Sequence, residues 1–344
     1  MLINLKLRDQ DFQFRSGSGE RLLYAGLSSR IDLPYECASG TCGTCKAKLV
    51  SGEVVNLWGD APGQTYLGSS GEILLCQSAA RGICQIEVQA RAQTPTPSAV
   101  PVSGTGVIQD VRPLAPDVLA FSLEIGRTID FEAGQFFCLQ FPQATGFRSY
   151  SIVNFERECS RLDFVVKRKA DGRLTPWLFQ NDIEGSLVEW FGPLGRAIFQ
   201  QDSVRDILCI AGGTGIAGIM SILRCAMESG HFAHSKGNVF FGVRSLADAF
   251  YLMELQELVR GGNGKLNVTI TLSEEDPMQE ARSEYPLLQF QRGFVHEVAK
   301  KMMAGQYQDI VAYLAGPKPA VDAAMRVLLA ARVPVQNIRL DKFS

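Results

Sequence analysis

The hydrophobic pattern of the first ninety residues predicts a small unit built from short strands and one helix. Leu5, Leu7, Phe12 and Phe14 alternate with polar neighbours, as expected for two strands joined near residues 9–11. The other predicted elements are a helix opening at residues 19–20, a strand pair at 46–50 and 53–56 across a turn at 51–52, and a last strand at 83–88. A loop rich in glycine and cysteine separates the helix from the strand pair.

A proline-rich segment ends this first pattern. Residues 91–103 carry three prolines among small polar residues, which is typical of a semi-rigid linker. Short strands and turns follow, with predicted strands at 106–110, 118–123, 136–141, 149–153 and 162–167 and a short helix at 176–180. This spacing indicates a small antiparallel barrel.

From about residue 203, apolar strands alternate with helical stretches. The predicted strands are 207–211, 239–243, 266–272 and 310–314, and the predicted helices are 216–228, 246–259, 295–303 and 319–331. Such alternation is the pattern of a parallel sheet covered on both faces. We therefore expect a multidomain chain of α+β and α/β units, divided as 1–92, a linker at 93–103, then 104–202 and 203–344.

Composition and charge narrow the function classes. The net charge of −2 gives no basic field, so nucleic acid is not expected as a partner. No apolar run is long enough for a membrane helix, and the N-terminus lacks the pattern of an export signal. We therefore expect a cytoplasmic protein whose nine cysteines are thiols or metal ligands and not disulfides.

Four cysteines have the spacing of an iron–sulfur site. Cys37, Cys42 and Cys45 follow a C-x4-C-x2-C pattern, and Cys76 comes thirty residues later. A plant-type [2Fe–2S] cluster uses this spacing, and the small residues between the cysteines let backbone N–H groups approach the sulfurs. A zinc site is the alternative, but zinc ribbons usually pair two C-x2-C knuckles. The other five cysteines are interpreted as buried thiols.

A flavin site is predicted in the second unit. Arg148 can bind a pyrophosphate, Tyr150 can lie against the flavin ring, and Ser151 can hydrogen-bond near the reactive N5. An exposed strand that happens to carry an arginine is the alternative. The remaining residues predicted to bind the flavin are Ser149, Val166, Lys167, Gly172 and Thr175, the last two at a glycine turn that runs into a helix.

A nucleotide site is predicted in the third unit. A buried strand ends in Gly212, Gly213, Thr214 and Gly215, where glycines permit a tight turn and close approach of a dinucleotide. The spacing of these glycines differs from the G-x-G-x-x-G fingerprint of Rossmann dinucleotide-binding folds. Arg244 ends the next strand, where an adenosine ribose is read; it could bind a 2′-phosphate or be an unliganded surface arginine, and we expect NADH in preference to NADPH.

These motifs together resemble a known family. The segment Pro34–Cys45 resembles the cluster loop of plant-type ferredoxins with a β-grasp fold, and residues 56–63 resemble reductases of toluene-type monooxygenases and carbazole-type dioxygenases. Residues 132–136 and 192–195 and the segment G-G-T-G-I-A resemble the ferredoxin–NADP reductase superfamily. The resemblance implies FAD as the flavin, Thr214 beside the nicotinamide, and Gly316 and Pro317 at the nucleotide.

The chain departs from the family at two positions: Ala133 replaces the proline of the turn at 132–136, and Ala315 is the second. Relatives usually have cysteine where this chain has Ala315, so no catalytic role is assigned there. The end of the chain resembles the aromatic tail that covers the flavin in some relatives, with Phe343 as the stacking residue; a frayed tail is the alternative. Ser151 and Thr214 are the residues expected nearest the chemistry.

The whole chain resembles the three-domain reductase components of bacterial multicomponent oxygenases. The resemblance implies that electrons pass from NADH to FAD, then to the [2Fe–2S] cluster and to a terminal oxygenase or its intermediate ferredoxin, in aromatic or hydrocarbon oxidation. It implies that this partner docks around the Cys37–Cys45 loop. Two alternatives remain: a self-contained reductase of a small acceptor, such as a sugar-nucleotide deoxygenation intermediate, and a non-enzymatic redox sensor. A monomer is expected.

Overall fold

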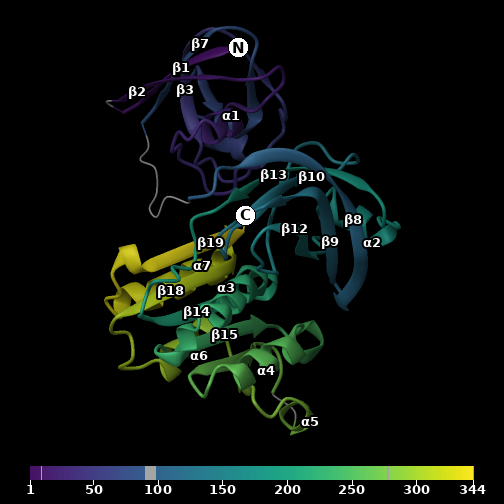
Figure 1. Cartoon of the computed structure of the whole chain (residues 1–344), viewed down its shortest axis with the longest axis vertical. Coiled ribbons are helices and arrows are strands. Elements are labelled where there is room, and N and C mark those ends of the chain that lie inside the picture. Colours follow the sequence, from purple (N-terminus) through teal and green to yellow (C-terminus); the bar gives the residue numbers. More distant parts are fainter. Residues whose placement is uncertain (9, 90–97, 277–278, 344) are drawn as a thin grey trace.

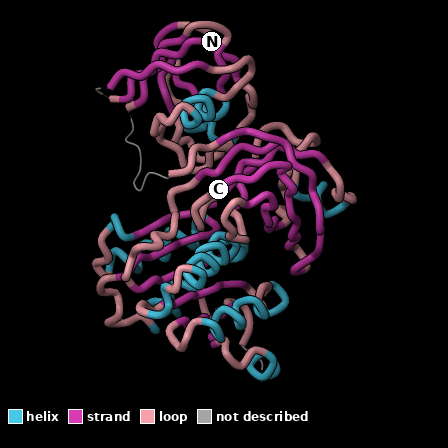
Figure 2. The backbone as a smooth tube through the Cα atoms, viewed as in Figure 1, coloured by secondary structure: helices cyan, strands magenta, loops and turns pink. Residues whose placement is uncertain are grey.

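The computed structural model describes residues 1–8, 10–89, 98–276 and 279–343. Figure 1 shows three successive bodies, with the N-terminal unit at the top, a curved barrel in the middle and an α/β unit below. Strands dominate the first two bodies and strands alternate with helices in the third (Figure 2). The predicted fold class and the order of its units are confirmed. Within the described ranges, no helix has the length and apolarity needed to cross a membrane.

The first unit is a five-stranded sheet with one helix packed on it. Its elements are β1 (Leu2–Leu7), β2 (Gln10–Arg15), α1 (Leu22–Ser28), β3 (Lys46–Ser51), β4 (Val54–Asn56), β5 (Glu72–Leu74), β6 (Ser78–Ala80) and β7 (Cys84–Val88), with short 3-10 turns at 62–66 and 75–77. The strand order is β2-β1-β7-β3-β5, and β1 and β7 are parallel. Part of the predicted turn, residue 9, lies outside the described residues.

The predicted strand pair at 46–50 and 53–56 is wrong. β3 pairs with β7 and β5, and β4 pairs with β6 in a separate two-stranded sheet. The cause is burial: Ala47 of β3 belongs to the core, so β3 takes a place inside the sheet. At Gly52 the chain lies so close to β7 that an added Cβ would meet the Ile83 carbonyl oxygen at 2.4 Å.

The second unit is a closed barrel. Its elements are β8 (Val102–Ala115), β9 (Val118–Ile129), β10 (Phe136–Gln140), β11 (Arg148–Ser151), β12 (Cys159–Lys167), α2 (Thr175–Gln180) and β13 (Leu187–Leu194). The strand order is β11-β10-β13-β8-β9-β12, and a bridge from Ile152 to Phe164 closes the ring. The prediction missed β13, and β8 begins at residue 102, inside the segment predicted as linker; residues 90–97 of that region lie outside the described part.

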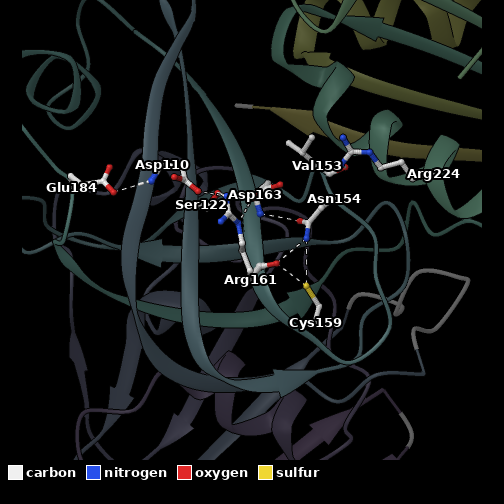
Figure 3. Close-up of polar contacts among 9 residues, drawn as sticks. All are labelled: Asp110, Ser122, Val153, Asn154, Cys159, Arg161, Asp163, Glu184 and Arg224. Carbon is white, nitrogen blue, oxygen red and sulfur yellow. Dashed lines mark hydrogen bonds and ion pairs between the residues drawn. The ribbon is translucent and has the colours of Figure 1, made fainter. Parts of the chain in front are cut away.

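A polar network on the barrel joins its strands and reaches the third unit. Figure 3 shows Arg161 between Asp110 and Ser122, with Asp163 beside it. Further along the network, Arg224 of helix α3 (Ile216–Glu228) donates a hydrogen bond to the Val153 carbonyl at 3.1 Å (Figure 3). The barrel and the nucleotide unit are therefore joined by a side-chain to backbone contact.

The third unit is a fully parallel six-stranded sheet. Its elements are β14 (Asp206–Gly212), α3 (Ile216–Glu228), β15 (Gly237–Val243), α4 (Leu252–Gly261), β16 (Leu266–Leu272), α5 (Gln279–Glu284), β17 (Gln289–Arg292), α6 (Val295–Met302), β18 (Ile310–Pro317), α7 (Lys318–Ala330) and β19 (Ile338–Phe343), with short 3-10 turns at 213–215, 231–233, 246–248 and 335–337. The order is β17-β16-β15-β14-β18-β19. The helix predicted at 246–259 is broken into a 3-10 turn and α4, and the edge strands β17 and β19 were not predicted.

The first unit and the barrel share one hydrophobic core. Barrel residues Phe136, Cys138 and Phe191 belong to the same buried cluster as the core of the first unit, whereas Phe137 and Leu139 point into the barrel interior. β10 is therefore apolar on both faces because both faces are buried. The first unit lies against β10 and β13 in Figure 1, so its position on the barrel is set by apolar packing.

Candidate functional site

The four predicted cluster cysteines lie together as two pairs. The thiols of Cys45 and Cys76 are 3.2 Å apart, and both side chains are buried. Cys37 and Cys42 contact each other through a backbone N–H of each residue and the thiol of the other, at 3.4 and 3.5 Å. Two pairs of thiols are the donor set that a two-iron cluster needs, since each iron takes two protein ligands.

The loop around Cys37 favours a thiolate. Its Sγ accepts N–H groups from Ser39, Thr41 and Cys42 at 3.4 to 3.5 Å. The Cys42 thiol and these N–H groups lower the pKa of Cys37 well below its usual range, although burial opposes them. Gly40 has a φ of +94°, and an added Cβ there would meet the Gln77 side chain at 2.7 Å. The residues present therefore fit an iron–sulfur cluster.

The described residues offer no competing metal centre. No three His, Cys, Asp or Glu side chains among them converge on one metal position. The other five cysteines are buried, as predicted. Burial raises the pKa of Cys138 to about 12, so this thiol beside the cluster loop stays protonated.

A cavity of about 150 Å³ lies where all three units meet. The first unit contributes residues of the cluster loop, the barrel contributes β10 and β11, and the third unit contributes the end of β19. Its lining residues are Glu36, Cys37, Ser39, Thr41, Phe136, Arg148, Ser149, Tyr150, Ser151, Asp341, Lys342 and Phe343. The structure thus brings together a cluster cysteine, four predicted flavin residues and the predicted aromatic tail.

The four residues of β11 make different contacts. Ser149 donates a hydrogen bond to the Cys37 carbonyl, and its hydroxyl is 2.9 Å from that of Ser39. Burial raises the pKa of Tyr150, so its phenol stays neutral at the cavity wall. Arg148 lies with its guanidinium 4.3 Å from the centre of the Trp58 ring and donates to the carbonyls of residues 145–147. β11 therefore joins the cluster loop directly to the cavity.

Ser151 has a partner that sequence reasoning missed. Its hydroxyl donates to a carboxylate oxygen of Asp341 at 2.5 Å. Burial raises the pKa of Asp341 to about 6, the Ser151 hydroxyl opposes this rise, and Glu36 adds to it. The two residues are 190 positions apart in the chain. The only signal in the sequence was the position of Asp341 two residues before Phe343, in the tail already predicted to reach the flavin.

The tail itself is a strand and is not frayed. β19 pairs in parallel with β18, which places Phe343 opposite Pro317. This pairing carries Asp341, Lys342 and Phe343 to the cavity. The frayed alternative is therefore wrong for residues 338–343.

The other predicted flavin residues do not line this cavity. Val166 is buried in β12, and Lys167 lies in the nucleotide cleft, 3.2 Å from Asp117. Thr175 accepts a hydrogen bond from the Lys169 N–H at 2.9 Å, and the Gly172 N–H donates to the Lys169 carbonyl. Gly172 and Thr175 therefore shape the turn before α2.

A second, larger cavity of about 270 Å³ lies at the carboxyl ends of the parallel strands. Its lining comes mostly from backbone and apolar side chains of the third unit, with a few barrel residues. Predicted residues among its lining are Lys167, Gly212, Gly213, Thr214, Arg244 and Pro317. Ligands bind at this edge of open parallel sheets, so the cleft is the candidate nucleotide site.

The glycines at this cleft have separate roles. An added Cβ at Gly215 would lie 2.3 Å from the Ala315 carbonyl oxygen, and one at Gly316 would lie 2.6 Å from that of Gly212. Gly316 also has a φ of +132°, where a side chain is strained. An added Cβ at Gly213 would meet no atom within 4 Å. Gly215 and Gly316 therefore let two strand ends pack together, and Gly213 leaves room for a ligand.

Arg244 is neutralised by two carboxylates. Its guanidinium is 3.2 Å from Asp248 and 3.8 Å from Asp117. Burial would raise the pKa of Asp248, but hydrogen bonds from Ser245 and Arg244 outweigh it and lower that pKa. Asp117 also pairs with Lys167 at 3.2 Å, so the charges of two carboxylates and two cations balance here and give an additional phosphate no net attraction.

Comparison with known proteins agrees with this geometry. Residues 5–81 match the family described as 2Fe-2S iron-sulfur cluster binding domain, residues 106–199 the oxidoreductase FAD-binding domain, and residues 209–326 the oxidoreductase NAD-binding domain. The ferredoxin–NAD(P)+ reductase CarAd of Metapseudomonas resinovorans is 33% identical over 95% of both chains. This chain belongs to the ferredoxin–NAD(P)+ reductases.

A further relative and two solved structures match this chain over nearly its whole length. The ferredoxin–NAD+ reductase component of the alkene monooxygenase system of Xanthobacter autotrophicus is 32% identical over 96% of this chain and 97% of its own. The solved ferredoxin reductase in carbazole 1,9a-dioxygenase superposes with a TM-score of 0.84, at 31% identity over 100% of this chain and 99% of the other. The Amycolatopsis cytochrome P450 reductase GcoB gives a TM-score of 0.80, at 27% identity over 99% and 98% of the two chains.

The comparisons and the donor set together define the enzyme class. The reductase is an iron–sulfur flavoprotein oxidoreductase that uses a [2Fe–2S] cluster, FAD and a nicotinamide nucleotide. Electron transfer between these groups is its activity, and the redox-sensor alternative from the sequence is set aside.

Proposed function

We propose that this reductase takes electrons from NADH and delivers them to the terminal oxygenase, or the intermediate ferredoxin, of a multicomponent oxygenase system. The observation that carries the proposal is the cavity shared by Cys37, Arg148–Ser151 and Asp341–Phe343. A cluster ligand, the flavin strand and the end of the nucleotide unit all line this one cavity, so no layer of protein separates them there. When bound, FAD accepts a hydride and hands on electrons singly to an iron–sulfur centre.

The chain's own residues have defined tasks in this proposal. Arg148 holds the flavin phosphates, Tyr150 and Phe343 enclose the ring, and the Ser151 hydroxyl, held by Asp341, sets the polarity beside it. Ser149 joins the flavin strand to the Cys37 carbonyl, so the two centres keep a fixed separation.

The nucleotide is proposed to be NADH. Thr214 and Gly213 line the cleft where the nicotinamide enters, and the cleft continues to Arg244. Asp248 and Asp117 already pair with Arg244, so a 2′-phosphate would have to displace or face two carboxylates. This charge arrangement supports NADH over NADPH.

The names of the relatives support an oxygenase partner but leave its type open. They include the reductase component of an alkene monooxygenase system, the electron transfer component of xylene/toluene monooxygenase from Pseudomonas putida, and a cytochrome P450 reductase from Amycolatopsis. The proposal therefore names an oxygenase in general. A reductase of a small-molecule acceptor is the competing function, and a monomer remains the expected state.

An anaerobic titration with NADH, followed by addition of acceptors, tests the proposal. We expect visible bands of a flavin and a [2Fe–2S] cluster that bleach together as NADH is added. Candidate oxygenases with their substrates should then consume NADH in proportion to hydroxylated product. NADH consumption with a small-molecule acceptor but with none of the oxygenases would favour the competing function, and a colourless purified protein would exclude both.

A further inference from the structure

The ferredoxin unit contacts the flavin strand at a second place, away from the cluster. The Arg148 guanidinium lies over the Trp58 ring, 4.3 Å from the centre of the ring. Two residues after Trp58, Asp60 forms an ion pair with Arg173 at 2.9 Å. Both arginines belong to the barrel, and both tryptophan and aspartate belong to the loop after β4. Two cations of the flavin-binding unit are therefore held by side chains of another unit.

The packing around Trp58 is close and fixed. Its side chain is 7% exposed, and an added Cβ at Gly146 would lie 2.5 Å from the indole ring. Gly146 has a φ of +78°, so the barrel turn before β11 is shaped to lie against this ring. The indole N–H is buried without an acceptor among the described residues. The contact with Arg148 is made by the face of the indole ring, which is the side that attracts a cation.

The loop that carries Trp58 is anchored on the cluster segments. The Leu57 N–H donates to the carbonyl of Gln77, next to Cys76, and the Gly63 N–H donates to the carbonyl of Gly40 between Cys37 and Cys42, both at 2.8 Å. The position of Trp58 is therefore tied to the folded cluster loop as well as to the barrel turn at Gly146.

The two arginines form one cationic corner. Burial lowers the pKa of Arg148, Tyr150 opposes this effect, and the nearby Arg173 lowers the pKa further. Two guanidinium groups close enough to repel each other are stabilised by an anion between them. A dinucleotide flavin carries a pyrophosphate, whereas riboflavin carries no phosphate.

We propose that Trp58 is a positioning residue of the FAD site: it orients Arg148 toward the flavin pyrophosphate, with Asp60 giving weaker help through Arg173, so the ferredoxin unit contributes to FAD affinity. This inference rests on the proposed function because it takes Arg148 as a pyrophosphate ligand. Trp58 itself touches no reacting atom. Asp60 and Arg173 are largely exposed, so their pair contributes little.

Flavin titrations of the full-length protein, stripped of FAD and with its cluster intact, test the inference. Trp58→Ala should weaken FAD binding about tenfold, because Arg148 keeps its hydrogen bonds to the carbonyls of residues 145–147 but loses the ring that lies against its guanidinium. Trp58→Phe should recover most of the affinity. The cluster absorbance should equal that of the native protein in both variants. Tyr66→Ala, which removes an exposed aromatic side chain of the same unit, should leave FAD affinity unchanged.

Two further measurements separate positioning from general damage. Riboflavin affinity should be the same in Trp58→Ala and the native protein, since no phosphate is involved. In the double variant Trp58→Ala/Arg148→Ala, FAD affinity should match that of Arg148→Ala alone. Equal losses for FAD and riboflavin, or additive losses in the double variant, would overturn the inference. Should Trp58→Ala not fold, Trp58→Leu, which also removes the aromatic face, carries the same comparison with Trp58→Phe as the variant that keeps it.

The outcomes also distinguish the inference from the function on which it rests. If Arg148→Ala weakens FAD binding and Trp58→Ala does not, the inference fails and the proposed flavin site stands. If Arg148→Ala itself binds FAD with native affinity, the proposed flavin site fails.

Discussion

The cavity at the cluster and the cleft at the nucleotide are built in opposite ways. The cluster cavity is held by side chains from three units, including the partly buried pair of Ser151 and Asp341 and the contact between Ser149 and Cys37. The nucleotide cleft is formed by backbone at Gly212 and Gly213 and by partly exposed ion pairs. Groups that stay bound can be held by preorganised buried contacts, whereas a nucleotide that enters and leaves needs an open, less specific surface.

The largest expected effect comes from removing a cluster ligand. Cys76→Ser replaces a buried thiol that lies 3.2 Å from Cys45. We expect loss of the iron–sulfur absorbance and a fall of roughly 100-fold in cytochrome c reduction, because a hydroxyl is a poor cluster ligand. Reduction of the flavin by NADH should persist, since the cleft is intact.

Iron content, visible spectra and the two rates measure this prediction. Cys225→Ser is the matched control: it changes a buried cysteine of the third unit and should keep the cluster. A Cys76→Ser protein with a full complement of iron would show that the four-cysteine assignment is wrong.

Next in size is the effect of Asp341→Asn on stability. The native carboxyl has a pKa of about 6 because it is buried. The unfolded chain releases this proton near pH 4, so the free energy of unfolding falls as the pH rises from about 4 through 6 and stays lower above. The amide that replaces the carboxyl does not titrate, so the variant should be the more stable protein at neutral pH, by up to about 3 kcal/mol.

Thermal denaturation at pH 4.5 and at pH 7.5 measures this difference. The advantage of Asp341→Asn should be larger at pH 7.5 than at pH 4.5. Asp309→Asn, at an exposed ion pair with Arg205, should show no such pH dependence. An advantage that is the same at both pH values would mean that Asp341 does not titrate between them.

A smaller effect is expected from Gly316→Ala at the nucleotide cleft. The added Cβ would lie 2.6 Å from the Gly212 carbonyl oxygen, at a φ of +132°. Strain of this kind costs about 1–3 kcal/mol, so the rate of flavin reduction by NADH should fall about tenfold while the cluster spectrum is unchanged.

Stopped-flow measurement of flavin reduction tests this effect. Gly305→Ala is the control because Gly305 also has a positive φ, of +78°, but no atoms near its added Cβ. Equal losses in the two variants would show that backbone strain alone, and not the contact with Gly212, is responsible.

The smallest expected effect concerns the choice of nucleotide. Asp117→Asn removes a carboxylate that lies 3.8 Å from Arg244 and 3.2 Å from Lys167. Both cations then become available to a 2′-phosphate, so kcat/KM for NADPH should rise about threefold, with little change for NADH. Asp276→Asn, at an exposed pair with Arg292, is the control. An unchanged ratio of the two nucleotides would show that Asp117 does not influence selectivity.

Local patterns were enough to predict the order of the three units and the iron–sulfur cluster, and the resemblance to a known family supplied FAD as the flavin. The spacing of Cys37, Cys42 and Cys45 and the strand–glycine–helix segment at 207–228 depend on neighbours in the chain, and the structure keeps both as predicted. The strand pair at 46–56 failed because local alternation does not determine which strand is the partner. There, burial of Ala47 in a five-stranded sheet prevailed over the short turn.

The sequence by itself determined which cofactors the chain can bind, because ligand spacing and glycine turns are encoded within short segments. Only the tertiary structure decided that Asp341 meets Ser151, that Trp58 supports Arg148, and that β10 is covered on both faces. Each of these contacts joins residues of different units. Their pairing follows from how apolar surfaces pack and strands align over the whole chain, and no single segment carries that information.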